Sequence, residues 1–562
     1  MKNHPLLFLL TLSTALLPAT ETTSPGAPAP FPFAEATIEQ LQTRMQAGTL
    51  TAHALTAAYL ARIAALDRAG PNLNAVIEIN PDALALADQL DGERAAGKVR
   101  GLLHGIPVLL KDNIATADRM ETTAGSLALV GAKPLHDAAL VARLRQAGAV
   151  ILGKTNLSEW ANFRGDRSVS GWSGRGGQTH NPYALDRSPS GSSSGSAVAV
   201  AANLCVVAIG TETAGSIIVP ASTCGIVGVK PTLGLVSRTG IIPIAASFDT
   251  AGPLTRTVRD AALVLAALAG DDAAEAAIIA DRPADPSGCL GPPGADAMPH
   301  ALLAGLRESL KAPLPANALK GARLGYVRIA QVQPNLDQAL GAALQSLRDA
   351  GAEVIEVGEF PGIDLARGQM LEVFYYEMKI GLNAYLATLG PEARMKSLAD
   401  LITFNDEHWA QEQPLFGQQE FVRAQSKGPL TEPAYLNALA ASRRISRCEG
   451  IDALLGRYHL DALVALANTP ARLIARTEAA DPIFGPHGPS GDSGCLPAAL
   501  AGYPSVTVPM AEVAGLPVGL LFYGGAWTEV KLLALAADFE ARTQARREPR
   551  FLPSILKIPV AK

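Results

Sequence analysis

Residues 188–232 read SPSGSSSGSAVAVAANLCVVAIGTETAGSIIVPASTCGIVGVKPT. The stretch opens with a cluster of serine and glycine, continues through small apolar residues, and then reaches the apolar run CVVAIG. A flexible Gly/Ser linker would not run directly into a helix of small residues and a buried strand, so a linker is excluded. A phosphate-binding loop is excluded as well, because the GK[ST] ending of such loops is missing.

Working outward, short apolar runs that end in polar turns recur along the chain, with helical patterns between several of them. The runs are GIPVLLKDN (105–113), AVILGKTN (149–156), CVVAIGTE (205–212) and GIVGVKPT (225–232), and the helical patterns cover 138–147 and 197–204. Residues 322–358 form the clearest unit, a strand, a helix and a second strand, with Gly351 as the helix stop. Strands that alternate with helices predict an α/β layered fold.

Further strands are expected after a long helical stretch. The runs DALVALAN (461–468), PSVTVPM (504–510) and PVGLLFYGG (517–525) have strand character, and residues 365–457 have mostly helical character. Because strands occur on both sides of the helical stretch, we expect one large domain over residues 36–562, with a helical insertion around 365–457 that could form the wall of a cleft.

The first residues have the features of a targeting segment. Lys2 precedes an apolar stretch at residues 6–17, so residues 1–20 are expected to be a signal peptide, followed by a Pro/Ala-rich linker at 21–35. The alternative is a buried core helix. The signal predicts export, to a bacterial periplasm, and no stable membrane insertion after its removal, because no other segment is continuously apolar over a membrane-spanning length.

The composition narrows the possible partners. The chain has 562 residues, of which 48% are hydrophobic and 18% charged, and this excludes disorder for most of it. Its 47 Lys and Arg against 52 Asp and Glu give a net charge of −5, so no basic excess indicates a nucleic-acid partner. Five cysteines are sparse, and CxxC and CxxH spacings are absent, so we expect neither a disulfide framework nor a metal site.

One candidate nucleophile lies in the serine cluster. Residues 191–195 match the GxSxG pattern of a nucleophile elbow, in which Ser193 would attack and a base such as His487 would activate it. An elbow needs an apolar strand immediately before the serine, whereas the preceding residues, NPYALDRSPS, are polar and contain two prolines. The pattern therefore favours this interpretation only weakly.

A second candidate, Ser216, ends the turn TETAGS that follows the apolar run CVVAIG. Small residues in such a turn let a substrate carbonyl approach the backbone, and consecutive backbone N–H groups can stabilise a developing oxyanion, each donor contributing about 3 kcal/mol. The expected oxyanion donors are the N–H groups of Thr213, Ala214, Gly215 and Ser216.

A serine hydroxyl needs a base, and Lys111 is a candidate. It ends the apolar run IPVLL, so it can be buried at the end of a strand, where desolvation disfavours its charged form. The alternative is a structural lysine that extends to solvent or pairs with the neighbouring Asp112.

Taken together, these pieces resemble the amidase signature family. The matching motifs are GIPVLLKDN, KTNLSEWA, GSSSGSAVAVAA, GTETAGSIIVPA, GIVGVKPT, AGYPSVTVPM and LPVGLLFYGG. The resemblance implies a central mixed β-sheet covered by helices on both faces and a Ser–cis-Ser–Lys catalytic set without metal or organic cofactor. By motif, Ser216 is then the nucleophile, Lys111 the base, and Ser192 the proton relay after a cis peptide from Gly191.

Within that family the segment from KTNLSEWANFR to GSSSGSAVAVAANL looks most like the bacterial peptide amidases. The resemblance implies hydrolysis of carboxamide C–N bonds, namely the C-terminal amides of peptides, with release of ammonia from an acyl-enzyme on Ser216. The alternatives are an exported amidase for aryl amides, aliphatic amides or lactams, and a non-catalytic periplasmic binding protein on the same fold. Trp160, Phe163 and Trp172 either shape the substrate pocket or belong to the core.

Overall fold

The computed structural model describes residues 31–270, 289, 300–329, 333–474 and 493–557. The chain divides between Ala34 and Glu35, and the elements that concern the site belong to the compact unit Glu35–Lys562. The expected signal peptide, residues 1–20, and most of the expected linker, 21–35, lie outside the described residues.

The central sheet contains eleven strands. They are β1 (Val76–Ile79), β2 (Pro107–Lys111), β3 (Val150–Thr155), β6 (Val207–Glu212), β7 (Val227–Lys230), β8 (Thr250–Thr255), β9 (Arg323–Arg328), β10 (Glu353–Glu359), β11 (Ala462–Leu466), β12 (Ser505–Val513) and β13 (Leu516–Tyr523). A separate two-stranded ribbon is made by β4 (Trp172–Ser173) and β5 (Gly177–Gln178).

The α-helices of the described residues are α1 (Ile38–Gln46), α2 (Ala52–Leu66), α3 (Ala83–Ala95), α4 (Ala139–Gln146), α5 (Ser194–Ala201), α6 (Ile218–Thr223), α7 (Val258–Leu268), α9 (His300–Lys311), α10 (Pro334–Asp349), α11 (Ile363–Ala387), α12 (Leu398–Glu407), α13 (Trp409–Glu412), α14 (Gln419–Gln425), α15 (Pro433–Ser446), α16 (Asp452–Tyr458), α17 (Leu496–Ala501) and α18 (Glu529–Thr543). Shorter turns of helix are η1 (Leu127–Leu129), η2 (Glu159–Asn162), η3 (Arg447–Ile451) and η4 (Ile555–Lys557).

The sheet is mixed, as predicted. Its strand order is β1-β3-β2-β6-β8-β7-β12-β13-β11-β9-β10. Strands β3, β2 and β6 are mutually parallel, as are β11, β9 and β10, and the strands between these two groups pair antiparallel. All side chains of β2 and β6 are buried, which explains why these strands are continuous apolar runs rather than alternating patterns.

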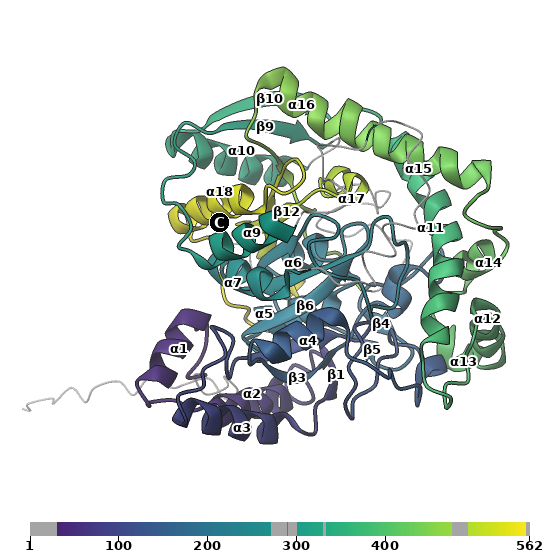
Figure 1. The fold of residues 1–562 in the computed structure, drawn as a ribbon. Coiled ribbons are helices and arrows are strands. Elements are labelled where there is room, and N and C mark those ends of the chain that lie inside the picture. The colour runs from purple at the N-terminus through teal and green to yellow at the C-terminus, as the bar shows by residue number, and fades with distance from the viewer. Residues whose placement is uncertain (1–30, 271–288, 290–299, 330–332, 475–492, 558–562) are drawn as a thin grey trace, which may run out of the picture. The chain divides into compact units, whose positions relative to one another are not determined.

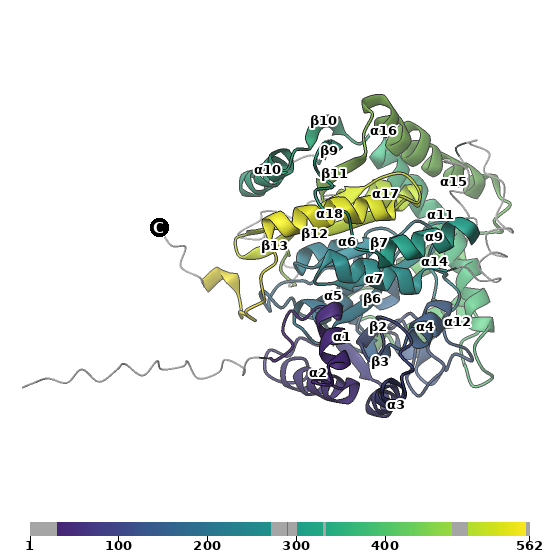
Figure 2. The same ribbon diagram turned by 60° about the vertical axis from the view of Figure 1, so that its left-hand side comes forward.

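Helices flank the sheet (Figures 1 and 2). Helix α5 contacts β6 and its neighbours, and every one of its residues is buried. Its small side chains allow this close approach: a Cβ on Gly195 would lie 2.2 Å from the Ala75 carbonyl oxygen and 2.5 Å from that of Asn156. Helices α7, α9 and α18 contact one another, and α7 and α18 also contact strands of the sheet.

The segment predicted as a helical insertion contains α11 to α16 and, among its described residues, no strand (Figure 1). Helix α11 packs against α15, α14 and α17. Their apolar side chains share a core cluster with Trp160, Phe163 and Phe248, and Ala214 packs against it from the neighbourhood of Ser216. The insertion therefore rests against the candidate catalytic segment.

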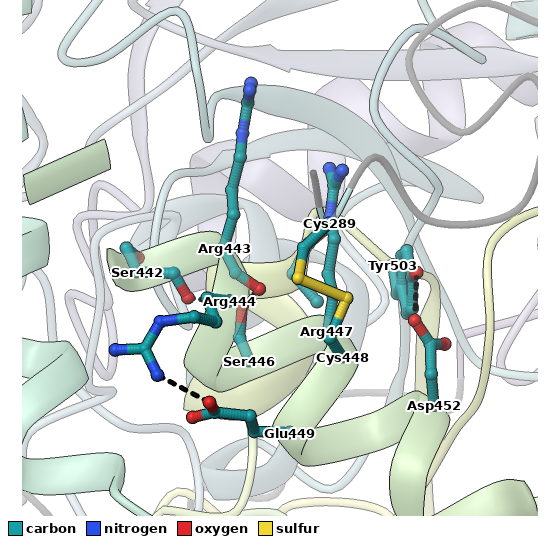
Figure 3. The surroundings of a disulfide bond; sticks show 11 residues. Cys289, Ser442, Arg443, Arg444, Ser446, Arg447, Cys448, Glu449, Asp452 and Tyr503 are labelled. Carbon is teal, nitrogen blue, oxygen red and sulfur yellow. Dashed lines mark hydrogen bonds and ion pairs between the residues drawn. A yellow bond between two sulfur atoms is a disulfide. The ribbon is translucent and has the colours of Figure 1, made fainter. Parts of the chain in front are cut away.

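A disulfide joins Cys289 to Cys448, with Cα atoms 5.8 Å apart (Figure 3). Cys448 lies in η3, beside Arg447, whose Nε donates to the carbonyl oxygen of Ala501 at the end of α17. Few and widely spaced cysteines did not predict this bond, because the partners are 159 residues apart. Three further cysteines, Cys205, Cys224 and Cys495, are free and buried.

Candidate active site

Lys111 is the last residue of β2, in the middle of three parallel strands, and its side chain is fully buried. Its Nζ lies 2.7 Å from Ser192 Oγ, 2.9 Å from Thr211 Oγ1 and 3.2 Å from the Thr211 carbonyl oxygen. Burial lowers the pKa of Lys111 to about 7, and the negative charges of Asp249 and Glu212 offset only part of that effect. The side chain is therefore neutral in a large fraction of molecules near neutral pH.

Ser192 follows a cis peptide bond from Gly191 and is also fully buried. The Ser192 carbonyl accepts a hydrogen bond from the Ser158 N–H at 3.1 Å. Gly191 is in close contact with its surroundings, because a Cβ there would lie 2.2 Å from Ser158 Oγ. The backbone before Ser192 thus requires glycine, and it directs the Ser192 hydroxyl to Lys111.

Ser216 lies in the turn between β6 and α6, and unlike Lys111 and Ser192 it is partly exposed. Its carbonyl accepts a hydrogen bond from the Ser193 N–H at 3.1 Å, which joins the segments of the two candidate serines. Beyond it, the Glu212 carboxylate accepts hydrogen bonds from the N–H groups of Ile217 and Ile218, at 2.7 and 3.0 Å. These contacts hold the turn from both sides.

The 213–216 turn has free donors. Among the described residues, no acceptor is found for the backbone N–H groups of Ala214, Gly215 and Ser216. Gly215 has φ +92°, and a Cβ there would lie 2.9 Å from Cys495 Sγ, so only glycine fits without strain. Consecutive unpaired N–H groups beside a partly exposed hydroxyl are the arrangement that an oxyanion requires.

The nucleophile-elbow interpretation fails in the structure. No strand precedes Ser193, whose segment is a loop before α5. The Ser193 hydroxyl is buried, donates to the Thr211 carbonyl at 3.0 Å and accepts from the Thr211 N–H at 3.2 Å. Ser193 therefore anchors the helix start to β6, and residue 487, its suggested base, lies outside the described residues.

The three aromatic side chains of uncertain role are buried. Trp160 is in edge-to-face contact with Phe421, with ring centroids 5.4 Å apart, and Trp172 makes the same kind of contact with Phe416. Phe163 packs edge-to-face against Phe374 of α11. These contacts make all three core residues that join the insertion to the site.

Two contacts at the site were missed by sequence reasoning. Thr211, inside a quoted motif, gives Lys111 two acceptors, and its hydroxyl also accepts from Asn113 Nδ2 at 3.0 Å. Asp249 accepts a hydrogen bond from Thr213 Oγ1 at 2.6 Å. Position within the motif could have suggested Thr211, but no spacing rule points from the 213–216 turn to Asp249.

The comparisons with known proteins agree with this geometry. The family model described as Amidase matches residues 54–533. The chain belongs to the amidase family. A probable amidase of Arabidopsis thaliana is 38% identical over 97% of each chain, and the crystal structure of native peptide amidase from Stenotrophomonas maltophilia superimposes with a TM-score of 0.82 at 51% identity, covering 93% of this amidase and 100% of that chain. The protein is thus an enzyme that hydrolyses amides, and the binding-protein alternative is set aside.

The prediction of export to a periplasm is wrong. A relative that is 34% identical over 91% of this amidase and 96% of its own length belongs to the glutamyl-tRNA(Gln) amidotransferase of Roseiflexus castenholzii, and tRNA is used inside cells. Another relative comes from a plant, which has no bacterial periplasm. Within the described residues, no helix has the length and apolarity needed to cross a membrane.

Proposed function

We propose that this amidase hydrolyses the C-terminal amides of peptides, releasing ammonia, through an acyl-enzyme on Ser216. The observation that carries the chemistry is the 2.7 Å contact between the buried Lys111 Nζ and Ser192 Oγ. The likeness to peptide amidase at 51% identity over the whole of that chain supports the peptide substrate.

The hydrogen bonds around Lys111 suit a neutral amine. The Thr211 carbonyl can only accept, so Lys111 donates one hydrogen to it, and a second can go to Thr211 Oγ1. This leaves the nitrogen lone pair directed at Ser192 Oγ. In the proposed reaction, Lys111 takes the proton of Ser192 while Ser192 takes the proton of Ser216.

Ser216 then attacks the amide carbon, and the carbonyl oxygen gains negative charge beside the N–H groups of the 213–216 turn. The proton returns through Ser192 to the departing nitrogen, so ammonia leaves and an ester remains on Ser216. A water molecule, deprotonated by the same route, attacks the ester and releases the peptide with a free carboxylate.

The test compares ammonia release from an N-blocked dipeptide amide with release from acetamide, benzamide and a simple lactam. We expect the dipeptide amide to have the highest kcat/KM. An enzyme that hydrolyses the small amides but not the dipeptide amide would contradict the proposed substrate and support the alternative of an amidase for aryl amides, aliphatic amides or lactams.

The nucleophile is tested separately with a sulfonyl fluoride that labels reactive serines. Label should map to the peptide that contains Ser216, and Ser216→Ala should abolish both labelling and turnover. Ser193→Ala is the matched control, because it removes a neighbouring buried hydroxyl and should leave labelling in place. Persistent labelling of Ser216→Ala would refute the assignment.

A further inference from the structure

Asp249 precedes β8 and connects two parts of the site. One carboxylate oxygen accepts the hydrogen bond from Thr213 Oγ1 at 2.6 Å. The other accepts hydrogen bonds from the N–H groups of Ile244 and Ala245, both at 2.9 Å. Because Asp249 is only 8% exposed, these bonds form in a largely water-excluded setting, where charge-assisted hydrogen bonds are strong.

The same loop is anchored at its other side to the helical insertion. Glu377 of α11 accepts hydrogen bonds from the Ser247 N–H at 2.8 Å and the Ser247 hydroxyl at 2.6 Å, and from the Tyr435 hydroxyl of α15 at 2.7 Å. Residues 244–249 therefore lie between two buried carboxylates. Asp249 connects the loop to the start of the 213–216 turn, and Glu377 connects it to α11 and α15.

Asp249 also acts on Lys111 through its charge. Two carboxylates influence the ammonium of Lys111, Asp249 from the loop before β8 and Glu212 from the end of β6. Glu212 is engaged by the N–H groups of Ile217 and Ile218. Burial raises the pKa of Asp249 to about 6, which its hydrogen bonds and the charge of Arg238 counteract, so Asp249 is mostly ionised at neutral pH.

We propose that Asp249 is a positioning residue of the amidase reaction, which holds Thr213 at the start of the 213–216 turn and places a negative charge opposite Lys111. The role rests on the proposed function, in which Lys111 is the base. A carboxylate at this place makes protonated Lys111 less unfavourable, so it sets the pH at which the lysine becomes an effective base, while its hydrogen bond to Thr213 fixes the backbone that the oxyanion uses.

The test uses Asp249→Asn with Glu377→Gln as the matched control, and measures kcat, KM and the pH dependence of kcat/KM. Both substitutions replace a buried carboxylate on the same loop by an amide, but only Asp249 acts on Lys111. Loss of the opposing negative charge should move the acid limb of Asp249→Asn to lower pH by roughly 0.5–1 unit, and kcat should fall by about 10- to 100-fold. Glu377→Gln should lower the melting temperature without moving the acid limb.

An unmoved acid limb in a folded Asp249→Asn enzyme would overturn the inference. If that variant does not fold, Thr213→Val tests the positioning contact, because it removes only the hydroxyl that Asp249 accepts; kcat should fall at least about tenfold with KM nearly unchanged, and wild-type kcat would overturn the proposal. Lys111→Ala separates this inference from the proposed function. Near-normal activity of Lys111→Ala would refute the proposed function itself, whereas an inactive Lys111→Ala with an unshifted Asp249→Asn would refute the inference alone.

Discussion

Lowering the pH should switch this amidase off at a point set by Lys111. The base acts only when neutral, and burial lowers its pKa from 10.5 to about 7. The neutral fraction is therefore present above pH 7 and is lost as the pH falls through 7. From that value it is about one half at pH 7, about one tenth at pH 6 and about one hundredth at pH 5.

The assay follows ammonia release from an N-blocked dipeptide amide between pH 5 and 9, under conditions that give kcat/KM for the free enzyme. The logarithm of kcat/KM should fall with unit slope on the acid side and reach a plateau above about pH 8. A dipeptide amide without titratable groups ensures that the profile reports the enzyme. Circular dichroism at each pH, and recovery of activity after return to pH 8, separate protonation from unfolding.

A profile that stays flat down to about pH 5, with the protein folded throughout, would refute a neutral lysine base. A limb centred near pH 4 would point instead to a carboxylate base. Either result would remove Lys111 from the proposed mechanism while leaving the amidase family assignment intact.

Three further outcomes are expected. Lys111→Met should lower kcat by at least about 10³-fold, yet urea unfolding at pH 7 should show no loss of stability, because keeping this lysine neutral costs roughly 5 kcal/mol of folding free energy for a pKa lowered from 10.5 to about 7; a loss above about 2 kcal/mol would contradict this balance. Gly191→Ala should abolish turnover in a protein that still folds, because its Cβ would lie 2.2 Å from Ser158 Oγ; retained turnover would show that the backbone can shift freely. Cys448→Ser should lower the free energy of unfolding by about 2–5 kcal/mol, since its bond to Cys289 closes a separation of 159 residues, and an unchanged urea midpoint would show that this bond contributes little.

Some elements could not be recognised from local pattern. Strand β8 has the sequence TAGPLT, in which Gly252 and Pro253 both disfavour strands, yet it lies between β6 and β7 in the middle of the sheet. Gly252 is needed there, because a Cβ would lie 2.0 Å from the Val229 carbonyl oxygen. The strand exists because its neighbours on both sides supply hydrogen bonds and close packing, which no propensity within six residues can express.

Sequence alone was sufficient for features that depend on neighbouring residues. The buried runs that became β2, β3, β6 and β7, the small residues that let α5 lie against the sheet, and the glycines at 191 and 215 all carry a local physical signature, namely apolar continuity or the absence of a Cβ. Only the tertiary structure decided how basic Lys111 is and what holds the 213–216 turn. Both depend on burial and on charges such as Asp249, 138 positions further along the chain than Lys111, and desolvation arises only when such distant segments pack together.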